Sequence, residues 1–220
     1  MIISCVLLLV QNSCNISLFP VQELALLKRS LAYGCVSRVF FNPLVAKVMS
    51  IFLNAEYGKN KLTPKQIITD PVLFLAFGFG SGLARKAPGT MGTLAAIPVY
   101  WLFYQTQSLL IYSVLTVLVT VVGIWICDEA ANKLGEHDFG GIVWDEVAGY
   151  LITLWIVPLS WQTILAGFVL FRILDIIKPW PIKWLDQHVE GGFGIMIDDV
   201  LAAVFAGGLL FLIVNLGWIS

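Results

Sequence analysis

The sequence predicts an all-α fold: a polytopic membrane helical bundle of about four hydrophobic helices, with motif loops on one face. Of the 220 residues, 59% are hydrophobic and 12% are charged, and the mean hydropathy is +0.88. A soluble domain carries about twice that share of charge. Apolar runs alternate with short polar segments, which is the pattern of a chain that enters a bilayer several times.

The first 69 residues differ from the rest and are predicted to form a poorly ordered N-terminal extension. They hold seven basic residues against two acidic ones and show no helical periodicity. The short polar leader after Met49 leads to the hypothesis that translation starts there, so that residues 1–48 are an upstream, untranslated extension. The membrane domain is assigned to residues 70–220, where twelve acids outnumber six bases.

Helix signals and breakers set the order of elements in this domain. Asp70-Pro71 is predicted to cap a helix that continues to Phe79. Leu109–Cys127 is a full span without charge, whereas the apolar run before it is shorter than the ~20 residues of a perpendicular span. The other predicted apolar segments are residues 92–104, 144–157, 163–177 and 200–214.

Counting these segments places the polar loops together. If each helix crosses the membrane, the polar loops fall on one side and the uncharged turns fall on the other. From Met91 onward, every charged residue lies in or beside one of these polar loops. Because all six basic residues after Asp70 belong to that group, the positive-inside rule places it in the cytoplasm. The predicted charged side holds residues 80–91, 128–145 and 178–199, and the other side holds residues 105–108, 158–162 and the C-terminus.

Two acidic pairs and one further aspartate suggest a metal site. Carboxylates at a helix start are favourable to the helix dipole, so capping alone explains one acid of a pair. A larger cluster on one membrane side fits Mg²⁺ better, since this ion binds through a few carboxylates, waters and substrate phosphate. The predicted metal ligands are Asp145, Glu146, Asp175, Asp198 and Asp199.

Arg172 and Lys178 flank Asp175, and the spacing of Arg172 and Asp175 puts them on one helical face before Pro179 ends the helix. One interpretation is charge balance for Asp175, or snorkelling of the basic side chains to the headgroups. The other is phosphate binding, in which arginine offers a bidentate fork. The residue chemistry supports both interpretations equally.

The glycine-rich stretch Gly78–Gly92 can present backbone N–H groups to an anion, or its glycines can simply permit close packing. Ser81, Thr90 and Thr93 add hydroxyl donors and are predicted to bind substrate together with the two basic residues above. Thr93 is alternatively a cap for the helix that follows. The signal of this stretch is weak by itself.

The histidines and cysteines give weaker signals still. His137-Asp138 is more typical of a hydrogen-bonded loop than of a catalytic dyad. The four cysteines form no CxxC pair, and Cys127 lacks the arginine that a CxxxxxR phosphatase loop requires. A net charge of −1 indicates no nucleic-acid partner.

Several ordered motifs together resemble the bacterial phosphatidylglycerophosphatase A family, from about Asp70 to the C-terminus. The resemblance implies Mg²⁺-dependent hydrolysis of phosphatidylglycerophosphate, a phospholipid partner in the membrane, an all-helical fold and a multi-pass location in the bacterial inner membrane. The matching motifs are Gly78-Phe-Gly-Ser-Gly82, Pro88-Gly-Thr-Met-Gly-Thr93, His137-Asp138, Ile142-Val-Trp-Asp-Glu146, Phe171-Arg-Ile-Leu-Asp175, Lys178-Pro-Trp-Pro-Ile182 and Gly191-Gly-Phe-Gly-Ile-Met-Ile-Asp-Asp199.

Within this resemblance, Mg²⁺ held by some of the five acids would polarise the phosphoryl group and orient a water. Arg172 and Lys178 would compensate the developing charge. One carboxylate or His137 would serve as base, and attack by Asp145 or Asp175 itself stays open. The predicted catalytic residues are Asp145, Asp175, Arg172, Lys178 and His137.

Two alternatives remain beside the phosphatase. A phosphoalcohol transferase would need a longer spaced series of aspartates than the chain contains. A cation transporter would place acids in mid-span or on both sides of the membrane, whereas here one predicted side bears no charge.

Overall fold

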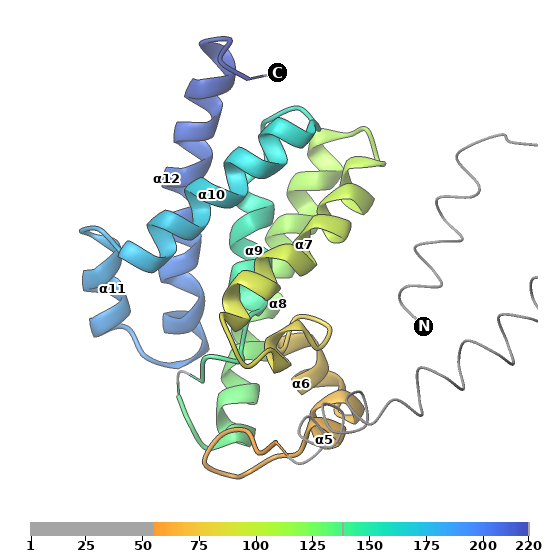
Figure 1. Cartoon of the computed structure of the whole chain (residues 1–220), viewed down its shortest axis with the longest axis vertical. Helices are drawn as coiled ribbons and strands as arrows, with labels where there is room; N and C mark the ends of the chain where they lie inside the picture. The colour runs from red at the N-terminus through yellow and green to blue at the C-terminus, as the bar shows by residue number, and fades with distance from the viewer. Residues whose placement is uncertain (1–54, 138, 220) are drawn as a thin grey trace, which may run out of the picture. The chain divides into compact units, whose positions relative to one another are not determined.

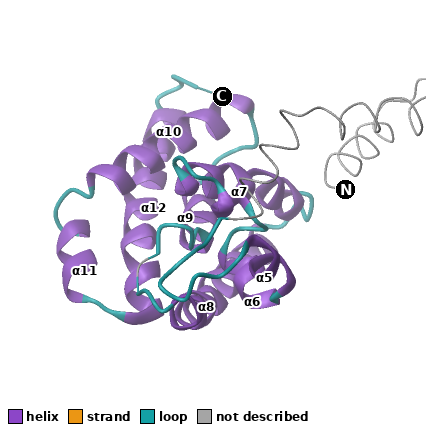
Figure 2. Cartoon of the chain, turned by 60° about the horizontal axis from the view of Figure 1, so that its bottom comes forward, coloured by secondary structure: helices purple, strands orange, loops and turns teal. Residues whose placement is uncertain are grey.

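The computed structural model describes residues 55–137 and 139–219, which belong to one compact unit, Leu53–Ser220. These residues form helices and no strand, which confirms the all-α prediction for this part of the chain (Figures 1 and 2). The proposed start at Met49 lies outside them. The helices are α5 (Pro64–Thr69), α6 (Pro71–Ala76), the 3-10 turn η2 (Ser81–Leu83), α7 (Pro88–Tyr104), α8 (Leu109–Leu134), α9 (Trp144–Thr153), α10 (Trp161–Ile177), α11 (Ile182–His188) and α12 (Gly191–Asn215).

The two central helices are α9 and α12, which pack against each other; α12 also packs against α8, α10 and α11, and α9 against α7 and α8 (Figure 1). Small residues allow this close contact. A side chain at Gly207 would place its Cβ 3.1 Å from the Thr153 carbonyl oxygen, and one at Gly149 would meet the Phe171 ring at 2.7 Å. These glycines therefore allow α9 to pack closely against α12 and α10.

Helix α8 continues past the predicted end at Cys127 to Leu134. Its last two turns are polar but still helical, with Glu129 and Lys133 forming an i, i+4 ion pair of 3.9 Å. The helix ends where Gly135 adopts the left-handed conformation, at φ 70°. The predicted loop therefore begins only after Leu134, and the polar residues that follow Cys127 extend the helix.

Helix α12 begins at Gly191 rather than at the predicted Val200, so the end of the predicted loop 178–199 instead forms the first turns of a helix. A Cβ at Gly192 would lie 2.0 Å from the backbone oxygen of Ile124 in α8. The Gly192 N–H donates to Asp128 Oδ1 at 2.9 Å. The glycines thus permit α12 to start in direct contact with α8.

Two helices, α8 and α12, are long and apolar enough to cross a membrane. Helices α7 and α10 have 17 residues each and α9 has 10. At about 1.5 Å per residue, these are shorter than a ~30 Å hydrocarbon core. Large apolar side chains of α8, including Val117, Val121 and Trp125, are exposed as expected of a lipid-facing surface. Within the residues that the structure describes, two candidate spans are therefore found where about four were predicted.

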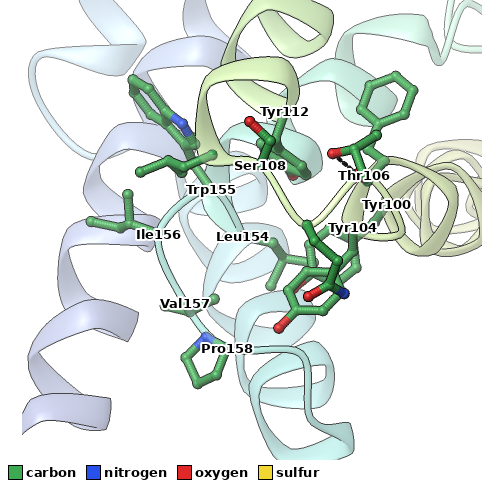
Figure 3. A pocket seen from close by; sticks show the side chains of 13 residues that line it. Tyr100, Tyr104, Thr106, Ser108, Tyr112, Leu154, Trp155, Ile156, Val157 and Pro158 are labelled. Atoms are coloured by element: carbon green, nitrogen blue, oxygen red, sulfur yellow. Dashed lines mark hydrogen bonds between the residues drawn. The ribbon is translucent and has the colours of Figure 1, made fainter.

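The end of the bundle away from the charged loops holds a cavity of about 320 Å³ (Figure 3). Thr106 and Ser108 of one turn and Trp155 and Pro158 of the other line it, and none of its lining residues is charged. The two turns predicted to share the uncharged side therefore lie together. Helix α9 ends at Thr153, before its predicted end at Val157.

Residues 55–69, predicted as part of a poorly ordered extension, contribute to the core instead. Ile67 is fully buried, and Tyr57 is nearly so and donates its hydroxyl to the Leu83 carbonyl at 3.1 Å. These side chains pack with buried residues of α6 and α8. The predicted domain boundary at residue 70 therefore lies inside the compact unit.

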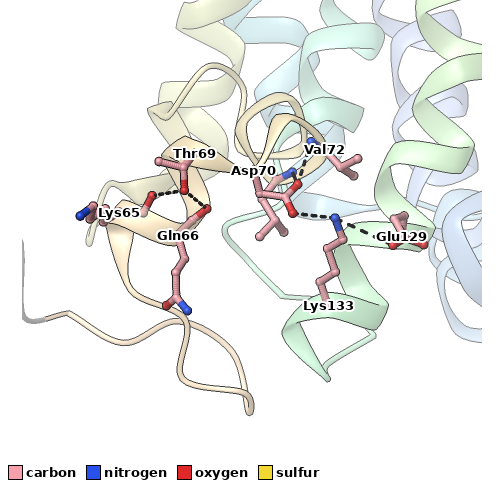
Figure 4. Close-up of polar contacts among 8 residues, drawn as sticks. Lys65, Gln66, Thr69, Asp70, Val72, Glu129 and Lys133 are labelled. Atoms are coloured by element: carbon pink, nitrogen blue, oxygen red, sulfur yellow. Dashed lines mark hydrogen bonds and ion pairs between the residues drawn. The ribbon is translucent and has the colours of Figure 1, made fainter.

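Asp70 joins the first helices to α8, as Figure 4 shows. Its Oδ1 accepts from the backbone N–H groups of Val72 and Leu73 at 2.9 and 3.1 Å, which confirms the predicted cap of α6. Its Oδ2 accepts from Lys133 Nζ at 2.7 Å. Burial raises the pKa of Asp70, but the hydrogen bonds from Lys133 and from the backbone lower it more, so that the net pKa is below its ordinary value.

We expect Lys133→Met to lower the free energy of unfolding by about 1 kcal/mol near neutral pH. Since the folded pKa of Asp70 is depressed, its stabilisation is present above the unfolded pKa of about 3.9 and is lost as pH falls through the folded value. Denaturant unfolding in detergent at several pH values measures this difference. The matched control is Lys65→Met, at an exposed position of α5. A loss that is the same at low and neutral pH would contradict the ion-pair interpretation.

Candidate functional site

The polar loops converge on a cavity of about 160 Å³. Its lining comes from the loop before α9, from α9 itself, from the end of α10, from α11 and from α12. This confirms that the segments 128–145 and 178–199 share one end of the bundle. The lining residues are His137, Gly140, Ile142, Asp145, Glu146, Asp175, Lys178, Asp186, Val189, Gly194, Ile195, Asp198 and Asp199.

Helix α9 is anchored to α8 by its first residue, Trp144. Trp144 is buried, and its indole N–H donates to the Val119 carbonyl of α8 at 3.2 Å. The residue before it, Val143, has no side-chain cap to offer. Asp145 and Glu146 follow in the first turn, where the helix dipole favours negative charge. The local sequence therefore directs two carboxylates from the helix N-terminus toward the cavity.

Three carboxylates form what we call the carboxylate cluster: Asp145 and Glu146 of α9 and Asp199 of α12. One oxygen atom from each lies within 4.8 Å of the other two. Asp145 Oδ1, Glu146 Oε2 and Asp199 Oδ2 are buried and have no hydrogen-bond partner. Unpartnered buried oxygens from three acids match the donor set that a hard divalent cation prefers.

The electrostatics of the cluster favour a cation. Burial raises the pKa of Asp145, and the adjacent Glu146 carboxylate raises it further. Burial likewise raises the pKa of Glu146, with Asp199 adding to the rise and Arg172 opposing it. Crowded carboxylates out of water resist ionisation unless a positive charge compensates them. The cluster by itself holds more negative charge than its surroundings neutralise.

Asp175 lies at the edge of the cluster, beside Asp199. Its Oδ2 is 2.6 Å from Arg172 Nη1, and the same nitrogen is 3.6 Å from Glu146 Oε1. The predicted common face of Arg172 and Asp175 on one helix is confirmed. Arg172 therefore connects Asp175 to the cluster, and Asp175 is placed as an ion-pair partner rather than within the group of three.

Asp198 points to a different partner. Its Oδ2 accepts from Lys178 Nζ at 2.6 Å, and Lys178 also contacts Asp186 of α11. Burial lowers the pKa of Lys178, but the hydrogen bonds to both carboxylates raise it above its ordinary value overall. Asp186 was not predicted as a site residue, and its only signal in the sequence was its position within a polar segment between apolar runs.

The N-terminus of α7 approaches the cluster from another side. A Cβ at Gly89 would lie 2.1 Å from Glu146 Oε1 and 3.1 Å from both terminal nitrogens of Arg172. Ala87, the residue before the helix, makes no side-chain cap, so the first turn carries uncapped N–H groups. Thr90 is half-buried in this same turn. Within the glycine-rich stretch Gly78–Gly92, Gly89 therefore lies next to the carboxylate cluster.

Two of the three predicted substrate-binding hydroxyls are engaged elsewhere. Thr93 is fully buried and donates to the Gly89 carbonyl at 3.0 Å, and Ser81 donates to the Phe77 carbonyl at 3.4 Å. Neither lines the cavity. Gly78 and Gly82 pack against the segment before α9, so the close-packing interpretation fits this part of the glycine-rich stretch.

His137 lines the rim of the cavity and is exposed. Its Nε2 accepts from the Gly191 N–H at the start of α12, so this nitrogen is engaged by the protein. His188 stacks on Trp184 with the ring centroids 4.7 Å apart, and does not line the cavity. Cys127 is buried and free of disulfide bonds.

Comparisons with known proteins converge on one family. The family model described as Phosphatidylglycerophosphatase A matches residues 74–214, which include α7, α9, α10 and all but the last residue of α12. The phosphatidylglycerophosphatase A of Escherichia coli K12 is 49% identical over 147 residues, covering 66% of this chain and 85% of that protein. That of Haemophilus influenzae is 45% identical over 156 residues, covering 70% and 96%.

A third relative, from Bacteroides thetaiotaomicron, is provisionally described as a phosphatidylinositol-3-phosphatase. It is 41% identical over 143 residues, covering 62% of this chain and 88% of that protein. No solved structure matches the chain. The descriptions of these three relatives all name a phosphatase that acts on a phospholipid.

Proposed function

This chain belongs to the phosphatidylglycerophosphatase A family and is a lipid phosphatase, and we propose that it hydrolyses phosphatidylglycerophosphate to phosphatidylglycerol and inorganic phosphate in phospholipid biosynthesis. The observation that carries the proposal is the carboxylate cluster, whose unpartnered buried oxygens lie beside Arg172 within the segment that the family model matches. Neither a transferase nor a cation transporter is favoured by these findings.

We propose that Asp145, Glu146 and Asp199 hold a Mg²⁺ ion. Their geometry fits such an ion, because one oxygen of each carboxylate lies within 4.8 Å of the other two, and each carboxylate also has a buried oxygen without a protein donor. A bound Mg²⁺ supplies Lewis acidity toward the phosphoryl oxygens and orientation of the attacking water. The predicted ligands Asp175 and Asp198 have the basic partners Arg172 and Lys178, and in this proposal they hold those side chains in place.

Arg172 and the first turn of α7 are proposed to bind the terminal phosphate. The guanidinium lies against Gly89, so a phosphate beside it can also accept from the uncapped N–H groups of that turn. Lys178 adds a second positive charge at the cavity. These groups stabilise the charge that develops on the phosphoryl oxygens.

In the proposed reaction, a water oxygen forms a bond to phosphorus while the bond between phosphorus and the glycerol oxygen breaks. The attacking water loses a proton to a carboxylate of the site, and the departing glycerol oxygen takes a proton from that carboxylate, which returns the carboxylate to its ionised form. Asp175 is our proposed acceptor, because it borders the cluster without being one of the three proposed metal ligands. His137 is less suited, since its Nε2 accepts from Gly191.

The proposed location is the bacterial inner membrane, with several passes and with the cavity facing the cytoplasm. The two candidate spans, α8 and α12, support membrane insertion. The basic residues Arg172 and Lys178 lie at the cavity end, and the cavity at the other end has no charged lining. The positive-inside rule then assigns the carboxylate cluster to the cytoplasmic side.

Phosphate release from phosphatidylglycerophosphate by the purified full chain tests the proposal. We expect release with Mg²⁺, loss of release in EDTA, and recovery when Mg²⁺ is added in excess of the chelator. A phosphatidylinositol 3-phosphate sample run in parallel tests the choice of lipid. Release that persists in EDTA would reject the metal assignment, and release only from the inositol lipid would reject the proposed substrate.

A further inference from the structure

Helix α11 carries an exposed aromatic surface next to the cavity. Trp180, just before the helix, is 84% exposed, and Trp184 within it is 53% exposed. Ile176 and Ile177 at the end of α10 and Phe193 at the start of α12 are also exposed. Large apolar side chains at this density in contact with water are costly, and they mark a surface that another phase or molecule covers.

The two sides of α11 have different surroundings. Ile182 is fully buried, and Asp186, one turn later on the same side, lines the cavity and contacts Lys178. Trp184 and His188 lie on the opposite side and stack on each other. The helix is therefore held to the cavity by one face while the other face presents an aromatic surface.

The place of α11 in the fold suggests what covers that surface. Only two residues, Val189 and Glu190, separate it from the candidate membrane span α12, against which it packs (Figure 1). Tryptophan prefers the interface between lipid and water, where its ring is apolar and its N–H stays hydrated. Lys183, exposed on the same helix, adds a positive charge that complements anionic headgroups.

We propose that α11 is an interfacial anchor: Trp180 and Trp184 insert among the lipid headgroups and hold the cavity mouth at the membrane surface, so that a lipid phosphomonoester reaches the carboxylate cluster without leaving the bilayer. This rests on the proposed function for the identity of the substrate. It adds to that function a recognition surface for the bilayer itself, outside the groups that contact the phosphate.

The test compares two double variants of the full chain reconstituted in lipid vesicles. The first is Trp180→Ser with Trp184→Ser. The matched control is Trp161→Ser with Trp218→Ser, which removes two tryptophans that are 72% and 75% exposed at the start of α10 and after α12. Phosphate release is measured from long-chain phosphatidylglycerophosphate in the bilayer and from a short-chain, water-soluble form of it.

We expect the first variant to lose about tenfold in kcat/KM on the bilayer substrate and to stay within about twofold on the soluble one, because only delivery of the lipid is impaired. The control should stay within about twofold on both substrates. An equal loss on both substrates would overturn the proposal, since it would indicate a structural or catalytic effect. Unchanged release from the bilayer would overturn it as well.

A second readout does not depend on turnover. Lipids brominated near the headgroup quench tryptophan fluorescence, and we expect the first variant to lose part of the quenchable signal of the wild type, because Trp180 and Trp184 contact those lipids in this proposal. If the wild type releases no phosphate from either substrate, the proposed function fails while this readout still decides the anchor. A quenchable signal in the first variant equal to that of the wild type would reject the anchor, and so would conversion of an oligomer to a monomer in the first variant, which would assign the surface to a protein partner.

Discussion

Asp199→Asn is expected to reduce phosphate release about 10³-fold while leaving the protein folded. Asp199 is the most buried member of the carboxylate cluster, at 2% exposure, and its Oδ2 has no partner within the protein. Asparagine keeps the shape of the side chain but removes the charge and one anionic ligand. Initial rates at saturating Mg²⁺ and over a Mg²⁺ titration measure the effect.

The same substitution should leave the thermal midpoint unchanged or raise it. It removes one of three crowded buried carboxylates, and the remaining two repel each other less than three do. Opposite changes in activity and stability distinguish a functional acid from a structural one. Glu190→Gln is the matched control, because Glu190 is exposed just before α12 and does not line the cavity. Near-native release by Asp199→Asn would remove it from the proposed metal site.

Gly89→Ala is expected to reduce kcat/KM about 10²-fold, since small displacements of positioned groups are costly to catalysis. The added methyl group would lie 2.1 Å from Glu146 Oε1 and 3.1 Å from the Arg172 terminal nitrogens, so both side chains must move. The groups that must move are side-chain ends, and alanine is a better helix former than glycine, so the fold should tolerate the change. Steady-state rates and thermal unfolding report these two effects separately.

Gly208→Ala is the control for this substitution. Gly208 also lies within a helix, α12, but a Cβ there would meet nothing within 4 Å. We expect unchanged activity and a slight gain in stability from the better helix former. Activity at the wild-type level in Gly89→Ala would show that the first turn of α7 does not shape the phosphate site.

The convergence of the polar loops could be predicted from the sequence, because it depends only on the order of apolar segments and on where charges occur. The different partners of the individual acids could not be predicted from the sequence. Successive residues on a helix point about 100° apart, so Asp198 and Asp199 face different partners although they are neighbours. Asp198 meets Lys178 and Asp199 joins the cluster, a difference that depends on how α12 is rotated against α9.

The start of α12 was misplaced for a related reason. Glycines in sequence favour turns, and only the close contact of Gly192 with Ile124 of α8 shows why they begin a helix here. Likewise, hydroxyl groups near a glycine-rich stretch suggest ligand donors. Thr93 instead donates to the Gly89 carbonyl within its own helix, which is a local alternative that spacing does not reveal.

The contribution of α12 to the cluster has a consequence for biosynthesis. Asp145 and Glu146 leave the ribosome well before Asp199, which lies in the last helix of the chain. A nascent polypeptide without that helix has two acids of the three and lacks the neighbour that completes the proposed cation site. The proposal therefore predicts that competence for hydrolysis arises only when the final segment has packed against α8 and α9, and that incomplete translation products are inert toward the lipid.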